Sequence, residues 1–288
     1  MCDPKQFETD LRKYMTRREF GALAAGAGLS LMLPRAADAL DIVEADVDIE
    51  TPDGIADAHF AHPASGAHAA VLVWPDILGL RPAFRQMGRR LAESGYAVLT
   101  VNPFYRVQRA PVVSEGASFA DEATRGIVLP MARALTPETH VTDASAFTEW
   151  LDGQSAVDSG RGMGTTGYCM GGPMVMRTAA TRPDRIAAAA TFHGSRLVMD
   201  DPASPHLLIP QMKAAFLIAI AESDDERDPE AKGILTRSFD ASGLAAEIEV
   251  YDGTAHGWCP PDSSVHNQPQ AERAWTRLLA LFDSGLAG

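Results

Sequence analysis

Short, continuous apolar runs recur along this chain, and segments with helical spacing separate them. Three clear examples are AAVLV at residues 69–73, YAVLTV at 96–101 and AAFLIAIA at 214–221. Continuous apolar strands are covered on both faces, whereas strands that alternate apolar and polar residues have one solvated face. Strands of this kind alternating with helices predict an α/β protein with a mostly parallel central sheet and helices on both faces.

The same patterns assign most of the remaining chain. Residues 46–61 alternate polar and apolar around the turn sequence PDG, which predicts an antiparallel hairpin at the sheet edge. Residues 102–130 show no regular period, and we expect a long irregular stretch there. Further strands are predicted at 162–168, 186–192 and 246–251, and helices at 84–94, 136–151, 170–181, 230–242 and 268–282.

The first 39 residues differ in character from the rest. A basic start precedes the apolar run GALAAGAGLSLMLP at residues 21–34, and AADA follows at 36–39. This order predicts an export signal cleaved after Ala39, because the run is shorter than the roughly 20 residues that span a bilayer. The segment TRREF resembles the twin-arginine export motif, with Arg17 and Arg18 as the pair. The alternative is an amphipathic terminal helix.

The signal sets the expected organisation and location of the protein. Residues 1–39 are the predicted signal and residues 40–288 a single domain, which we expect to be periplasmic or secreted. The twin-arginine export machinery is then a partner during secretion, and the mature chain has no stable membrane insertion. A net charge of −13 argues against nucleic acid and anionic membrane surfaces as partners.

The segment GYCMGG carries the most specific chemical signal. Gly167 to Gly171 match the pattern G-x-nucleophile-x-G, between a predicted strand and a predicted helix. A sharp reversal at Cys169 requires a strained backbone there, and the glycines avoid clashes between strand and helix. The thiol then lies at a helix N-terminus, where the dipole favours thiolate. The alternatives are a buried structural cysteine, or a redox thiol paired with Cys259.

Two later strand ends provide an acid and a base. Asp224 follows the run at 214–221, with Asp225 as the second choice. His256 follows the last predicted strand and precedes the last helix, whereas its competitor His193 ends the strand at 186–192. The order nucleophile, acid, histidine is that of the α/β-hydrolases.

The segment VWPDILGLRP follows the first buried strand. In a hydrolase of this kind the backbone N–H groups of Ile77 and Met170 are the candidate oxyanion donors. Asp76 is expected to lie close to the thiol of Cys169. The other interpretation of Asp76 is a simple loop or cap residue.

Together these segments resemble the dienelactone hydrolase family of α/β-hydrolases, with TTGYCMGG, AESDD and GTAHGW in the family's order. The resemblance implies a triad of Cys169, Asp224 and His256. It also implies that an acid in the first loop switches the thiol to its reactive form, and Asp76 stands where the best-known members have glutamate. The implied activity is hydrolysis of a small-molecule ester or lactone.

The expected substrate contacts depart from the family. Dienelactone-cleaving members hold the substrate carboxylate with arginines, one of them soon after the histidine. Here HGWCPPD has Trp258 in that region and no arginine, and Arg106 is the candidate for the other position. No metal site or cofactor motif is predicted. The competing hypotheses are a thiol or redox protein and a non-catalytic binding protein on the same scaffold.

Overall fold

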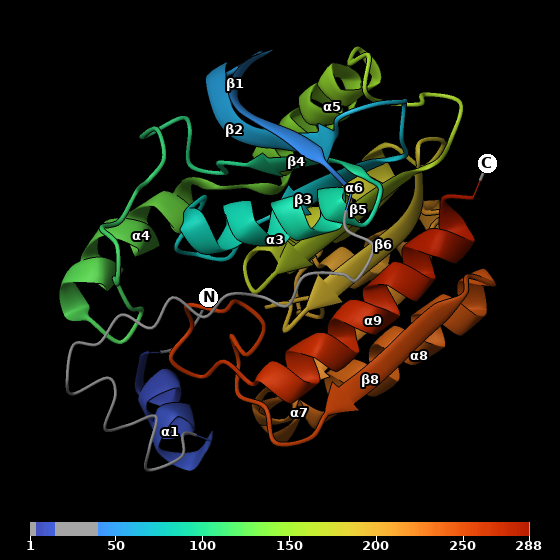
Figure 1. Cartoon of the computed structure of the whole chain (residues 1–288). Coiled ribbons are helices and arrows are strands. Elements are labelled where there is room, and N and C mark those ends of the chain that lie inside the picture. The colour runs from blue at the N-terminus through green and yellow to red at the C-terminus, as the bar shows by residue number, and fades with distance from the viewer. Residues whose placement is uncertain (1–3, 15–39, 288) are drawn as a thin grey trace.

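The structure is a computed structural model that describes residues 4–14 and 40–287 (Figure 1). Its centre is one sheet of eight strands in the order β1-β2-β4-β3-β5-β6-β7-β8. The strands are β1 Ile42–Thr51, β2 Gly54–Pro63, β3 Ala70–Trp74, β4 Ala97–Val101, β5 Met163–Tyr168, β6 Ile186–Phe192, β7 Ala215–Ala221 and β8 Ala246–Tyr251.

Six strands, β4-β3-β5-β6-β7-β8, run parallel, and β1 and β2 form an antiparallel hairpin that pairs with β4. β3, β4 and β5 are buried along their whole length, as continuous apolar or small-residue runs require. The predicted α/β-hydrolase fold, a mostly parallel sheet with an N-terminal antiparallel hairpin, is confirmed.

Helices cover both faces of the sheet (Figure 1). α3 and α9 contribute to one buried apolar cluster, and α5, α6 and α8 contribute to the cluster on the other face. The elements are α3 Pro82–Glu93, α4 Glu122–Ala134, α5 Pro137–Asp152, α6 Gly171–Thr181, the 3-10 helix η1 Pro205–Gln211, α7 Glu222–Arg227, α8 Pro229–Ser242 and α9 Gln268–Gly285.

Two segments differ from the sequence-based expectation. The irregular stretch expected over residues 102–130 is wrong in its last part, because α4 begins at Glu122 and continues past Pro130. Val128 and Met131 of this helix pack in a cluster with Phe104, so apolar burial compensates for the backbone hydrogen bond that proline cannot donate. The acidic run after β7, for which the sequence patterns predicted no helix, is also helical. It forms α7, with carboxylates in its first turn, where the helix dipole favours them.

The N-terminal helix α1, Pro4–Tyr14, contacts α7. Lys13 pairs with Glu226 at 2.6 Å, and Arg227 lies 3.4 Å from the buried carboxylate of Asp10. This helix precedes the apolar run of the predicted export signal. The apolar run and cleavage site of the predicted export signal lie outside the described residues. No helix in the described part of the chain combines the length and apolarity needed to cross a bilayer.

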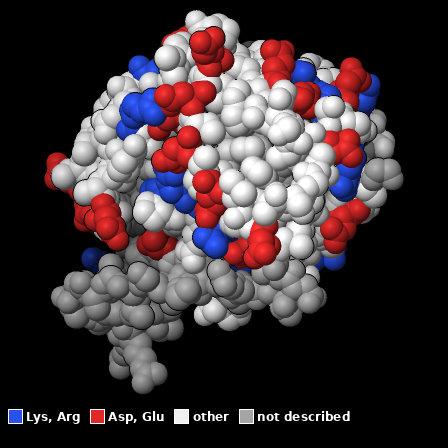
Figure 2. Space-filling view, turned by 45° about the horizontal axis from the view of Figure 1, so that its top comes forward, with Lys and Arg blue, Asp and Glu red and all other residues white. Residues whose placement is uncertain are grey.

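The surface carries both signs of charge. Figure 2 shows Lys and Arg side chains scattered among more numerous Asp and Glu side chains, with broad uncharged areas between them. On this face the described residues form no continuous basic area.

Candidate active site

The turn between β5 and α6 holds Cys169 in a strained conformation. Its φ angle is 51°, in the left-handed region that non-glycine residues rarely adopt, and the residue is 4% exposed. A Cβ atom on Gly167 would lie 2.5 Å from the Gly171 carbonyl oxygen, and one on Gly171 would overlap the carbonyl oxygen of Trp74. The predicted strain, and the need for glycine on both sides of it, are confirmed.

His256 and Asp224 come together from neighbouring strand ends. His256 follows β8 and Asp224 lies in α7, directly after β7. The Nδ1 atom of His256 lies 2.8 Å from Oδ2 and 3.0 Å from Oδ1 of Asp224. The hydrogen bonds join His256 to Asp224 and not to Asp225, the second choice of the sequence analysis. An acid in this position fixes the ring orientation and stabilises an imidazolium.

Backbone and hydroxyl contacts fix the loop of the histidine to the loop of the acid. The N–H of His256 donates to Ser223 Oγ at 2.9 Å, and the N–H of Ser223 donates to the Thr254 carbonyl at 3.2 Å. Thr254 is fully buried, and its hydroxyl donates to the Tyr251 carbonyl at 2.6 Å. These bonds join the loop that carries His256 to the start of α7, which carries Asp224.

A second histidine, His193, lies beside His256. Their rings meet edge to face with centroids 5.2 Å apart, and Trp258 packs on His193 at 6.3 Å. His193 is 1% exposed, and neither of its ring nitrogens has a hydrogen-bond partner among the described residues. Burial, followed by the charge of His256, lowers the pKa of His193 well below its usual range. His193 therefore stays neutral where His256 is paired with an acid.

The loop after β3 is tied to the loop after His256 by a buried arginine. Arg81 binds Asp76 through two hydrogen bonds of 2.6 and 3.0 Å, and binds Asp262 through two of 2.7 and 2.9 Å. Asp76 also accepts the N–H of Leu78 at 2.9 Å. Burial raises the pKa of the Asp76 carboxyl, and the Arg81 guanidinium opposes that shift. The carboxylate expected near the thiol is thus committed to Arg81.

The two candidate oxyanion donors lie in one apolar cluster. Ile77 is buried in it, and Met170 packs against it as the residue preceding α6. Within the described residues, no group accepts a hydrogen bond from the backbone N–H of Ile77 or of Met170. Both N–H groups are therefore available to a developing oxyanion.

The candidate substrate-binding residues have structural partners. Arg106 donates to Asp53 at 2.6 and 2.9 Å and to the buried Asp143 at 2.7 and 2.9 Å. These bonds connect the β1-β2 turn to α5. Trp258 is fully buried and stacks on Tyr251 with ring centroids 4.8 Å apart. Arg106 has its charge neutralised, and Trp258 contributes an apolar surface next to His193.

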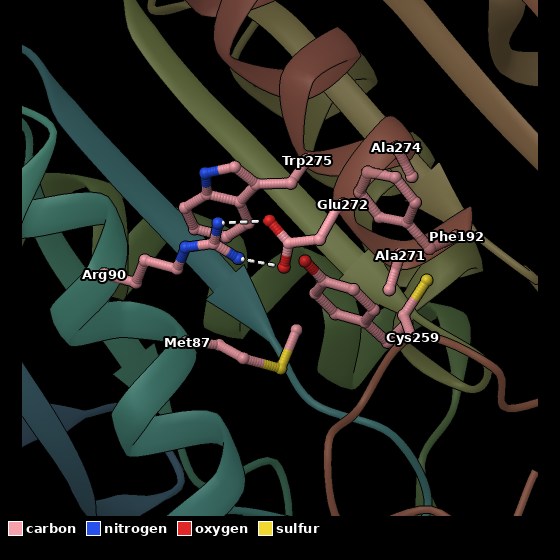
Figure 3. Close-up of a pocket in the computed structure, with 9 residues that line it drawn as sticks. Met87, Arg90, Phe192, Cys259, Ala271, Glu272, Ala274 and Trp275 are labelled. Carbon is pink, nitrogen blue, oxygen red and sulfur yellow. Dashed lines mark hydrogen bonds and ion pairs between the residues drawn. The ribbon is translucent and has the colours of Figure 1, made fainter. Parts of the chain in front are cut away.

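Cys259 lies in a small apolar pocket on the side of α3 and α9. Arg90 and Glu272 form an ion pair across the pocket at 2.6 Å, and the guanidinium lies 4.3 Å from the centre of the Trp275 ring (Figure 3). Burial raises the pKa of the Cys259 thiol well above its usual range, and His256 opposes the shift. No disulfide joins Cys169 and Cys259, both of which lie in the described part of the chain.

Several contacts of the site have no local signal in the sequence. Ser195 lies with its Oγ 3.6 Å from the Sγ of Cys169, and Arg81 reaches a residue 181 positions away. The only hint for Ser195 is its place in TFHGS, directly after an apolar strand. Among the described residues, no cluster of three or more His, Cys, Asp or Glu side chains could hold a metal.

A family model for the dienelactone hydrolases matches residues 56–286, from β2 to the residue that follows α9. The chain belongs to the dienelactone hydrolase family. A relative from Methylorubrum extorquens is 25% identical over 293 residues, which cover 96% of this chain and 97% of the relative. The carboxymethylenebutenolidase of Rhodococcus opacus is 24% identical over 230 residues, which cover 78% of this chain and 85% of that enzyme.

Solved structures show the same fold. A dienelactone hydrolase-like promiscuous phosphotriesterase from metagenomic libraries matches with a TM-score of 0.70 and 20% identity, covering 85% of this chain and 99% of its own. A dienelactone hydrolase from Anabaena variabilis matches with a TM-score of 0.61 and 17% identity, covering 85% and 99%. The candidate residues Cys169, Asp224 and His256 all fall inside the region matched to the dienelactone hydrolase family.

Proposed function

We propose that this protein is an exported hydrolase of small carboxylic esters or lactones that uses Cys169, His256 and Asp224 as a triad. One observation carries the proposal. A strained cysteine follows β5 and precedes a helix, and an imidazole held by a carboxylate lies at the same edge of the parallel sheet, after β8 and β7 respectively. Reactive groups of α/β proteins collect at this edge.

The proposed reaction begins with proton transfer from the Cys169 thiol to His256. The thiolate attacks the ester carbonyl, and the N–H groups of Ile77 and Met170 stabilise the oxyanion. His256 then protonates the leaving alcohol, which leaves a thioester on Cys169. The same imidazole takes a proton from water, the resulting hydroxide attacks the thioester, and the acid product leaves as the thiolate re-forms.

Asp224 holds the imidazole in the tautomer that presents Nε2 to the reaction and stabilises the imidazolium. The positive charge on His256 exists only between the two proton transfers. A carboxylate at 2.8 Å strengthens that state, and neutral His193 beside it adds no repulsion.

The arginines point to an uncharged substrate. Arg106 is engaged by Asp53 and Asp143, and Arg81 by Asp76 and Asp262, so neither carries an unbalanced charge for a substrate carboxylate. The segment after His256 supplies Trp258 and apolar neighbours instead. We therefore propose neutral esters or lactones rather than the carboxylate-bearing dienelactones of the family's best-known reaction.

Export is the second part of the proposal and rests on the sequence of residues 1–39. The expected product starts at Leu40 and is found outside the cytoplasm. Cell fractionation and intact-mass measurement of the exported chain test this. A mature protein that retains residues 1–39, or one confined to the cytoplasm, would contradict the signal.

The hydrolase is tested with a panel of 4-nitrophenyl esters and small lactones. Cys169→Ala should lower kcat by roughly 10⁴-fold or more, because the nucleophile is lost. Asp224→Asn should lower it by about 10²-fold to 10⁴-fold by losing the carboxylate that orients His256, whereas Asp225→Asn should stay close to wild type. Equal rates for Cys169→Ala and wild type would exclude the nucleophile. Inactivity of wild type on the whole panel would favour a binding protein.

A further inference from the structure

The hydroxyl of Ser195 contacts the proposed nucleophile. Its Oγ lies 3.6 Å from the Sγ of Cys169, within the range of hydrogen bonds that involve sulfur. Ser195 is a half-buried residue of the loop that follows β6. It comes from the strand next to the one that ends at the nucleophile.

The backbone fixes this contact at several points. The N–H of Ser195 donates to the carbonyl of Cys169 at 3.0 Å, and the N–H of Cys169 donates to the carbonyl of Phe192 at 3.1 Å. A Cβ atom on Gly172 would lie 2.7 Å from the Cα of Gly194, so the loop packs directly on the turn. Two backbone hydrogen bonds therefore hold the loop that carries the Ser195 hydroxyl against Cys169.

The same loop stores backbone strain. His193 has a φ angle of 41° and Arg196 one of 56°, so two non-glycine residues on either side of Ser195 adopt left-handed conformations. Each such residue costs about 1–3 kcal/mol and persists only where the surroundings impose it. These two left-handed residues direct the segment between them, which contains Ser195, over the turn that carries Cys169.

We propose that Ser195 is a catalytic residue that donates a hydrogen bond to the Cys169 thiolate. This inference rests on the proposed function of Cys169 as the nucleophile. Asp76, the acid that the family resemblance implies for switching the thiol, has its carboxylate bound to Arg81 and to the N–H of Leu78. The Ser195 side chain, by contrast, contacts the sulfur directly.

The hydrogen bond acts at two stages of the reaction. Before acylation, the thiol proton is transferred to His256. Ser195 keeps its own proton and donates a hydrogen bond to the charged sulfur. During hydrolysis of the thioester, hydroxide forms the new carbon–oxygen bond, the carbon–sulfur bond breaks, and the electron pair returns to sulfur. Ser195 stabilises the sulfur as it becomes negative again, which assists the step that is slow for a cysteine enzyme.

The test measures the thiol itself and needs no substrate. The rate of alkylation of full-length protein by iodoacetamide is followed from pH 5 to 10 by mass spectrometry of the peptide that contains Cys169. Ser195→Ala should move the midpoint of this profile upward by roughly one pH unit, because a charge-assisted hydrogen bond is lost. Ser195→Thr retains the hydroxyl and should restore most of the shift.

Ser238→Ala is the matched control, because Ser238 is a half-buried serine that hydrogen-bonds within α8 and should leave the profile unchanged. Should Ser195→Ala fail to fold, Ser195→Gly removes the same hydroxyl and takes its place. An unchanged midpoint in the hydroxyl-free variant overturns the proposal. If wild type hydrolyses nothing while the midpoint shifts, the proposed function fails and the Ser195 contact stands.

Discussion

Cys169 and Cys259 are almost equally buried, at 4% and 6% exposed, but their surroundings differ. Cys169 directly follows β5, has a left-handed backbone, precedes a helix and contacts a hydroxyl. Cys259 lies among the apolar and aromatic side chains of the pocket in Figure 3, where burial raises the pKa of its thiol. Burial alone therefore does not decide what a cysteine does. The backbone and the polar neighbours do.

The largest expected difference between the two cysteines is in alkylation. At pH 7, iodoacetamide should modify Cys169 about 100-fold faster than Cys259, because the thiolate reacts and burial suppresses it at Cys259. Peptide mass spectrometry over a time course measures both rates in one sample. Comparable rates would show that the two environments are chemically equivalent.

The next prediction breaks the turn that sets Cys169 apart. Gly171→Ala should lower the free energy of unfolding by about 3 kcal/mol, because the new Cβ overlaps the carbonyl oxygen of Trp74. Gly126→Ala is the control, since it adds a methyl group at an exposed position of α4 with nothing within 4 Å, and should stabilise by roughly 0.5–1 kcal/mol. Urea unfolding followed by circular dichroism measures both. Equal stabilities of the two variants would contradict the close approach.

His140 of α5 is buried without a compensating carboxylate among the described residues, and this should make the free energy of unfolding depend on pH. Burial, followed by the charge of Arg177, lowers the pKa of His140 to about 3. Between about pH 6.5 and pH 3, His140 is protonated in the unfolded chain but not in the folded chain. The free energy of unfolding therefore falls as the pH falls below 6.5. The slope from this group is up to about 1.4 kcal/mol per pH unit.

His140→Gln should remove that slope from urea unfolding measured at pH 7, 6 and 5. His68→Gln, at a half-exposed histidine near the protein surface, is the matched control and should keep the wild-type slope. A wild-type slope in His140→Gln would place the pH sensitivity elsewhere.

The smallest effect is expected at Cys259. Cys259→Ala should leave ester hydrolysis within about twofold of wild type and cost roughly 1 kcal/mol of stability, because it removes one buried sulfur atom. Steady-state kinetics and thermal unfolding measure the two quantities. A loss of activity comparable to that of Cys169→Ala would instead favour the alternative in which Cys169 and Cys259 act together as a redox pair.

The sequence predicted the six parallel strands within one residue, because continuous apolar runs respond directly to burial on both faces, whereas β1 begins four residues before the predicted hairpin. It also placed Cys169 on a strained turn, because the flanking glycines indicate that strand and helix pass close together there. It failed at α4, where Pro130 interrupts the helical pattern, and at α7, where charged residues hide a helix. Contacts between distant loops, such as Arg81 with Asp262 or Ser195 with Cys169, leave no local pattern because folding alone brings them together.

The order of the sheet has a consequence in time. β5 and the turn of Cys169 are synthesised before His256, which follows β8, the strand that pairs with β7 at the edge of the sheet. A growing chain therefore carries the nucleophile well before the base that is proposed to activate it. The proposed triad can therefore assemble only after the last strand has been made.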